Sequence, residues 1–94
     1  NMKVHVVAAM IVITLGFVLN ITRFEWMILL LCIAGVMSLE MVNTALEEIA
    51  NLVRDTDHLA YGATRRMRDM AAGAVLIMAI ASAIIGGLIF LPKI

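Results

Sequence analysis

Long apolar runs without a charged side chain are the feature that most restricts how this chain can fold. Val4 to Ile21, Trp26 to Leu39 and Met70 to Leu91 contain no Asp, Glu, Lys or Arg. Hydrophobic residues make up 64% of the 94 residues, and the mean hydropathy is +1.07. A soluble domain of this size cannot bury so much apolar surface. The sequence therefore predicts one integral membrane domain, residues 1–94.

The apolar runs predict an all-α membrane protein with three transmembrane helices. A helix needs about 20 mostly apolar residues to cross the hydrocarbon core, at a rise of about 1.5 Å per residue. The expected spans are residues 4–21, 26–53 and 64–91. The second is expected to continue beyond the membrane into water. Either Thr64 or Asp57 is expected to cap the third helix.

The basic residues predict the orientation of the three spans. Lys3 and the arginines of the second connection lie on one side of the membrane, and Arg23 and Lys93 lie on the other. That division is five basic residues against two of the seven in the chain. Because Lys and Arg are enriched in cytoplasmic loops, the second connection and the outer end of the second helix are expected in the cytoplasm.

The second predicted helix acquires a polar face where its apolar run ends. Four side chains share this face at helical spacing: Glu40, Asn43, Glu47 and Asn51. The run from Trp26 to Leu39 covers about 20 Å, which is less than a hydrocarbon core of about 30 Å. Glu40 is therefore expected at or just below the membrane surface, where an ionisable group marks a functional site or a specific partner.

Two chemistries and one plain alternative fit this polar face. Carboxylates one or two turns apart can bind a hard divalent cation or take a proton from a hydroxyl group, and the amide of Asn43 can hold a phosphate or ligand oxygen. The alternative is a solvated amphipathic surface. It applies to Glu47, Glu48 and Asn51 more readily than to Glu40, which follows an apolar segment.

A second polar cluster precedes the third apolar run and consists of Arg65, Arg66, Arg68 and Asp69. Arg68 could contact the phosphates of a nucleotide. Asp69 could fix a ligand or the second helix. Alternatively, Arg65 and Asp69 pair at i and i+4, or the arginines contact anionic lipid head groups.

Further along, Ala79, Ala83 and Gly87 form a stripe of small residues, which favours close helix packing and homo-oligomerisation.

Several function classes are disfavoured by what the sequence lacks. The formal net charge is zero, and no basic segment is interleaved with aromatics, so a nucleic-acid partner is not expected. The single cysteine, Cys32, has no internal partner for a disulfide. The phosphate-binding and catalytic loops of soluble kinases are absent. On pattern alone, His58 is a solvated loop residue and His5 an interfacial polar residue.

Two blocks of sequence resemble a known family. Residues 40–47 read EMVNTALE, and residues 68–76 read RDMAAGAVL. They are similar to the E-x-x-N-[ST]-A-[IL]-E and K-D-x-A-A-G-A-V-L blocks of the small bacterial diacylglycerol kinase and undecaprenol kinase family. Their order and their places at the ends of the second and third spans also agree. The resemblance covers nearly the whole chain.

The resemblance implies a trimer of three-span subunits in the bacterial inner membrane, with shared active sites on the cytoplasmic side. Such kinases transfer the γ-phosphoryl group of ATP to a lipid hydroxyl with Mg²⁺. By matching position, Glu40 is implied as the general base and Glu47 as a metal ligand that also contacts ATP. Arg68, Asp69 and a loop histidine at His58 are implied in nucleotide binding. Two polar site residues complete the set, Asn43 and Asn51.

The C-terminal sequence from Gly86 to Lys93 is more similar to the undecaprenol kinase branch, so undecaprenol is the expected substrate and diacylglycerol the alternative. The family's surface helix and a second metal-binding glutamate are expected upstream of Asn1.

Two other classes of function stay open. A small ion or proton transporter would use Glu40 to bind a cation. A catalytically weakened structural homologue is suggested by Arg68 and Asn51, which replace the family's usual Lys and Asp.

Overall fold

Helices make up nearly all of the chain that the structure describes. The computed structural model describes residues 2–56 and 62–94. Its elements are α1 (Met2–Val18), α2 (Arg23–Thr56), α4 (Arg65–Phe90) and the 3₁₀ helix η1 (Leu91–Lys93). No strand occurs within the described residues. The prediction of an all-α chain is confirmed.

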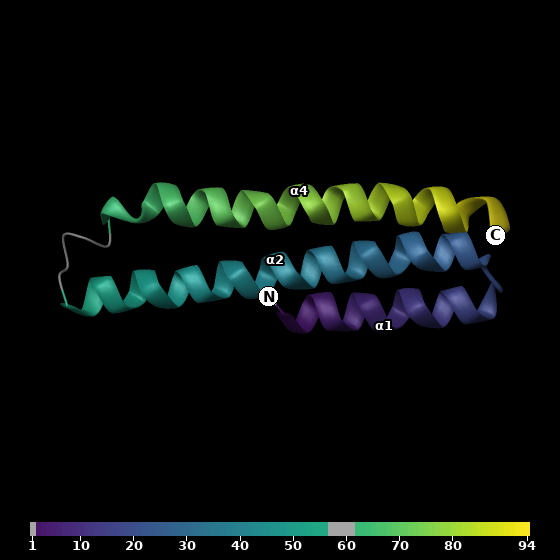
Figure 1. The fold of residues 1–94 in the computed structure, drawn as a ribbon, viewed down its shortest axis with the longest axis horizontal. Helices are drawn as coiled ribbons and strands as arrows, with labels where there is room; N and C mark the ends of the chain where they lie inside the picture. The colour runs from purple at the N-terminus through teal and green to yellow at the C-terminus, as the bar shows by residue number, and fades with distance from the viewer. Residues whose placement is uncertain (1, 57–61) are drawn as a thin grey trace.

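The three long helices form an elongated array with α2 in the middle (Figure 1). α1 lies beside the first half of α2, and α4 runs along most of its length (Figure 1). The array measures 53 × 18 × 18 Å. α2 packs against both neighbours, whereas α1 and α4 do not approach each other closely in the described part of the chain. Within residues 2–56 and 62–94, the second half of α2 therefore has only α4 as a neighbouring helix.

Two of the described helices are long and apolar enough to cross a membrane. They are α2, with 34 residues, and α4 continued by η1, with 29 residues from Arg65 to Lys93. α1 is also apolar but has 17 residues. Large apolar side chains point outward from all three helices, among them Phe17, Ile77 and Leu88 at 72–74% exposure. Such a surface suits a lipid environment or a partner subunit. A third span remains a prediction.

A tight reversal between Val18 and Arg23 sets the ends of α1 and α2. Asn20 adopts a positive φ of 53°, a conformation that Asn tolerates better than most residues. Next to it, the Ile21 N–H donates to the Gly16 carbonyl at 3.2 Å. α1 therefore ends before the expected boundary at residue 21, because the chain has already turned.

A capping box starts α2 at Arg23 rather than at residue 26. The Thr22 N–H donates to Glu25 Oε1 at 2.9 Å, and the Glu25 N–H donates to Thr22 Oγ1 at 3.2 Å. These two bonds satisfy backbone donors that a helix start leaves open. Glu25 Oε1 also lies 3.2 Å from Lys93 Nζ, so the same carboxylate joins the start of α2 to the end of the chain.

The best-packed part of the core lies at this end of the array. Ile21, Leu29, Ile89 and Phe90 form a buried cluster. Beside it, the Trp26 ring packs against Gly16 so closely that a Cβ at Gly16 would lie 2.7 Å from Trp26 Cη2. The Phe17 ring also packs on Trp26, and the two ring centroids are 5.0 Å apart. Gly16 thus allows α1 to approach α2.

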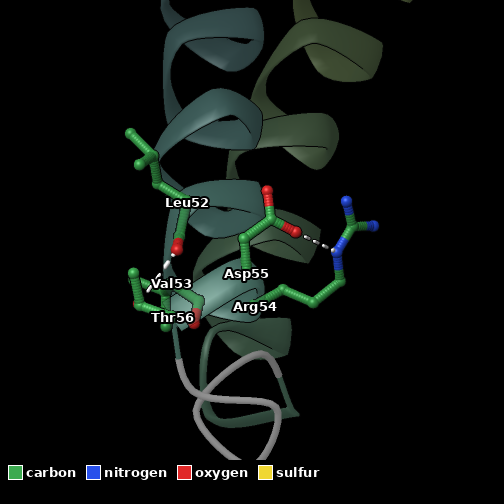
Figure 2. Close-up of polar contacts among 5 residues, drawn as sticks. All are labelled: Leu52, Val53, Arg54, Asp55 and Thr56. Atoms are coloured by element: carbon green, nitrogen blue, oxygen red, sulfur yellow. Dashed lines mark hydrogen bonds and ion pairs between the residues drawn. The ribbon is translucent and has the colours of Figure 1, made fainter.

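The far end of α2 closes its last turn locally (Figure 2). The Thr56 hydroxyl donates to the carbonyls of Leu52, at 3.0 Å, and Val53, at 3.2 Å, and Arg54 Nε lies 3.4 Å from Asp55 Oδ1. The two Thr56 bonds run from a side chain to backbone carbonyls of the same helix, within its last turns. Asp57, one of the two predicted caps, lies outside the described residues.

The other predicted cap is partly wrong. Thr64 occupies the N-cap position of α4, but its side chain makes no capping hydrogen bond. Its hydroxyl instead accepts from Arg68 Nε at 3.2 Å. The hydroxyl cannot bond the first free N–H groups of α4 in its present backbone conformation, which is already helical at φ −86° and ψ −2°.

Gly16→Ala should weaken the packing of α1 on α2. Its new Cβ would meet the rigid Trp26 ring, and overpacking of this kind costs about 1–3 kcal/mol, which outweighs a helix-propensity gain of about 1 kcal/mol. Gly86→Ala is the control because an added Cβ there meets no other described atom within 4 Å. Thermal unfolding in micelles, followed by circular dichroism, should show a lower Tm for Gly16→Ala only. Equal Tm values for the two variants would contradict this packing.

Candidate functional site

The polar face of α2 is divided into a buried and an exposed part. Glu40 and Asn43 are 6% and 7% exposed, although their neighbours on the membrane side are apolar. Glu47 and Asn51, on the same face about one and two turns further on, are exposed. The solvated-surface alternative fits the exposure of Glu47, Glu48 and Asn51. It does not fit Glu40 or Asn43.

Glu40 is covered by the first turn of α1. His5 Nε2 lies 3.3 Å from Glu40 Oε2, and the two side chains are 19% and 8% exposed. The pairing follows from the register of α1 on α2. Counted from the contact of Gly16 with Trp26 at about 1.5 Å per residue, His5 lies about 17 Å along α1 and Glu40 about 21 Å along α2, a difference of less than one turn. Sequence reasoning treated His5 as an interfacial residue. Counting residues back along both helices from a reversal between them was the signal that could have placed His5 near Glu40.

Asn43 connects the buried part of the face to the exposed part. Its Nδ2 donates to Glu47 Oε1 at 2.9 Å. Its Oδ1 is buried and has no hydrogen-bond partner among the described residues. A buried amide oxygen normally has a donor, so a ligand or a further chain is expected to supply one.

The basic cluster at the start of α4 forms two local contacts. Arg65 Nε lies 3.9 Å from Asp69 Oδ2, and both side chains are highly exposed, at 80% and 72%. This is the predicted i, i+4 pair, and exposed pairs of this kind contribute little to stability. Arg68, which bonds Thr64, is half-buried. Its contact to Thr64 holds the guanidinium along the helix surface.

The helix register brings this cluster level with the exposed carboxylates of α2. The Met78 side chain packs on Gly35, and the two helices are antiparallel (Figure 1). Counted along both helices at about 1.5 Å per residue from this contact, Arg68 and Asp69 lie at the height of residues 44–45, less than one turn from Glu47. The predicted nucleotide-binding residues of α2 and α4 thus share one level of the array. His58 lies outside the described residues.

The described residues do not by themselves enclose a metal ion. Within residues 2–56 and 62–94, no three or more His, Cys, Asp or Glu side chains are grouped to hold one. Mg²⁺ needs few protein ligands, because it is usually held by one or two carboxylates together with substrate phosphates and water. The exposed carboxylate of Glu47, oriented by Asn43, fits one such ligand.

An apolar groove of about 460 Å³ runs from His5 toward the reversal end. Residues of all three helices line it, among them His5, Ala9, Met37, Ala83, Gly87 and Phe90. The predicted small-residue stripe of α4 thus borders a groove. Ser82 also lines the groove, and its Oγ is buried without a partner among the described residues. At the end away from the reversal, the groove is bordered by His5, which pairs with Glu40.

Comparison with known proteins identifies the family. The family model for prokaryotic diacylglycerol kinase matches residues 1–90. The chain belongs to the prokaryotic diacylglycerol kinase family. The resemblance predicted from residues 40–47 and 68–76 is confirmed. Members of this family are membrane lipid kinases, in agreement with two helices long and apolar enough to span.

Two curated relatives carry this family's activities in their names. The chain is 47% identical to the undecaprenol kinase of Bacillus subtilis over 94 residues, covering 99% of the chain and 73% of the relative. It is 36% identical to the diacylglycerol kinase of Synechocystis over 92 residues, covering 98% of the chain and 51% of the relative. The chain therefore spans about half the length of the second relative. No solved structure gives a significant match.

Proposed function

We propose that this chain is the membrane kinase domain of an ATP-dependent lipid kinase, which phosphorylates a lipid alcohol. The observation that carries the proposal is the buried carboxylate of Glu40, held on α2 beside the end of an apolar groove. A lipid alcohol has the matching form, because its tail is apolar and its reactive end is a hydroxyl. Family membership supports the same reaction.

Glu40 is proposed as the general base. Phosphoryl transfer requires little covalent chemistry from the protein and depends mainly on positioning and charge stabilisation. A carboxylate near the acceptor can take the hydroxyl proton as the oxygen attacks the γ-phosphorus of ATP, while the bond from that phosphorus to the β,γ-bridging oxygen breaks and ADP leaves. With the tail in the groove, the hydroxyl would arrive next to His5 and Glu40.

The nucleotide is proposed to bind on the exposed level beyond Glu40. Glu47 would hold Mg²⁺, which when bound neutralises charge on the phosphates. Arg68 would contact the phosphates, and Asp69 and His58 would contact the nucleotide. The register of α2 and α4 supports this arrangement because it sets Arg68 and Asp69 within one helical turn of the height of Glu47. Asn43, bonded to Glu47, would orient that carboxylate. Asn51 would border the site.

A homotrimer is proposed to complete the site. Among the described residues, Asn43 Oδ1 has no hydrogen-bond partner and the second half of α2 has only α4 beside it, which is consistent with further groups from another subunit. The orientation predicted from the basic residues puts this half of α2 on the cytoplasmic side of the bacterial inner membrane, where ATP is available. Three spans per subunit are part of the same proposal.

Undecaprenol is the proposed acceptor, and diacylglycerol is the alternative. The higher identity to the Bacillus subtilis undecaprenol kinase, 47% against 36% to the Synechocystis diacylglycerol kinase, supports this order. Both lipids present a primary hydroxyl at the interface, so Glu40 can serve either. The choice between them depends on how their tails fit the apolar surface.

Glu40→Gln should abolish phosphoryl transfer without preventing nucleotide binding. Gln keeps the size of the side chain but cannot accept a proton, and loss of a general base lowers kcat by about 100-fold or more. The assay is transfer of labelled phosphate from Mg-ATP to undecaprenol or diacylglycerol in mixed micelles. Glu48→Gln is the matched control: Glu48 is exposed on the same helix, so its activity should stay within about twofold.

Two results would reject the lipid kinase proposal. The first is wild-type protein that gives no phosphorylated product with either lipid. The second is Glu40→Gln with full activity. Cation flux into liposomes without ATP would instead favour the transporter, and ATP binding without turnover would favour the weakened homologue.

Glu47→Gln should raise the Mg²⁺ concentration needed for half-maximal activity. Replacing a charged ligand by a neutral amide weakens divalent-cation binding, and we expect a shift of about tenfold or more. The measurement is a Mg²⁺ titration of transferase activity at saturating ATP, with Glu48→Gln again as the control. An unchanged titration midpoint in Glu47→Gln would argue against its role as a metal ligand.

A further inference from the structure

His5 is the residue of α1 that reaches the polar face of α2. Its Nε2 lies 3.3 Å from Glu40 Oε2 across the helix interface. Its side chain is 19% exposed, so the contact is shielded from water, and the Glu40 side chain is 8% exposed. His5 also lines the end of the apolar groove, together with Met37 of α2. One side chain therefore borders both the groove and the carboxylate.

We propose that His5 is a positioning residue, which fixes the Glu40 carboxylate toward the hydroxyl of the acceptor lipid. The inference rests on the proposed function, in which Glu40 is the base. A glutamate side chain has three rotatable bonds, and a hydrogen bond from a separate helix restricts them. Displacing a reacting group by about 1 Å can cost about 100-fold in rate, so this restriction matters for turnover.

The chemistry of imidazole suits this task. An ionised carboxylate only accepts hydrogen bonds, so the Nε2 atom facing Glu40 must carry the proton. A neutral imidazole supplies that donor without a full positive charge. Lys or Arg in its place would stabilise the ionised carboxylate strongly and make it a weaker base. His5 thus orients Glu40 and leaves it able to accept the hydroxyl proton.

The test compares three α1 variants in the phosphate-transfer assay. His5→Leu removes the donor, His5→Gln keeps an N–H donor, and Thr14→Val is the control. The Thr14 hydroxyl is on the exposed side of α1 and donates to the Met10 carbonyl of its own helix at 2.8 Å. Helix content, Tm and ATP binding are measured for each variant, so that a folding defect is recognised.

We expect His5→Leu to lower kcat by about 10- to 100-fold, with the KM values for ATP and lipid changed by less than about twofold. His5→Gln should recover kcat to within about fivefold of wild type, and Thr14→Val should match wild type. A residue that only filled space would not be rescued by an amide more polar than Leu. A residue that only bound the lipid tail would change the lipid KM instead of kcat.

A second measurement detects the contact between His5 and Glu40 independently of kinase activity. ¹⁵N NMR of histidine-labelled protein reports which ring nitrogen carries the proton, and the His5 signal is assigned by its loss in His5→Gln. The Nε2–H form should dominate in the wild type, and this preference should diminish in Glu40→Leu. An unchanged tautomer in Glu40→Leu would overturn the proposed contact.

The kinetic outcomes separate this proposal from the proposed function. Wild-type transfer with an unchanged kcat in His5→Leu would overturn the positioning role and leave the kinase assignment intact. A loss of activity in His5→Gln as large as that in His5→Leu would also overturn it. Wild-type protein that transfers no phosphate to either lipid would overturn the kinase assignment and the positioning role together.

Discussion

The contact between His5 and Glu40 is the constraint on which the arrangement of the helices depends. A carboxylate that is only 6% exposed on an apolar helix is costly unless a donor reaches it. α1 supplies that donor at 3.3 Å because the reversal after Val18 sends α2 back antiparallel to α1, which brings His5 within about one turn of the height of Glu40. The packing of Trp26 on Gly16 and the capping box at Thr22 fix this reversal. Features near the opposite end of α1 therefore determine where its first turn lies.

The same arrangement gives α2 two environments and a boundary between them. Its first half is packed between α1 and α4, and its second half has only α4 as a neighbour in the described chain. Glu40 and Asn43 lie at this boundary, with an apolar groove on one side and the exposed Glu47 on the other. A reaction between a lipid hydroxyl and a water-soluble nucleotide needs such a meeting point. A transporter would be expected to carry its carboxylate further into the apolar half, and would not require the cluster at Arg68 and Asp69.

Features set by neighbouring residues in the sequence could be predicted, and those set by contacts between helices could not. Apolar runs predicted the helices, helical spacing predicted the polar face of α2 and the Arg65–Asp69 pair, and two blocks predicted the family. The pairing of His5 with Glu40 was missed because it depends on where the chain reverses, and a positive φ at Asn20 is difficult to foresee. Thr64 was read as a side-chain cap, but its hydroxyl bonds Arg68 instead. The trimer, the metal ligand and the role of His58 stay predictions, since they involve other chains, ions or residues outside those described.

The central claim is that an acceptor lipid lies in the groove with its hydroxyl at Glu40. Photolabelling tests it most directly, using an undecaprenol analogue with a diazirine next to the hydroxyl, followed by peptide mapping of the labelled protein. The account predicts labels on the first turn of α1 and around Val36 and Met37 of α2, and their loss when unlabelled undecaprenol is added. Labels spread over the outward-facing residues Ile77 and Leu88 of α4, and unaffected by competitor, would contradict it.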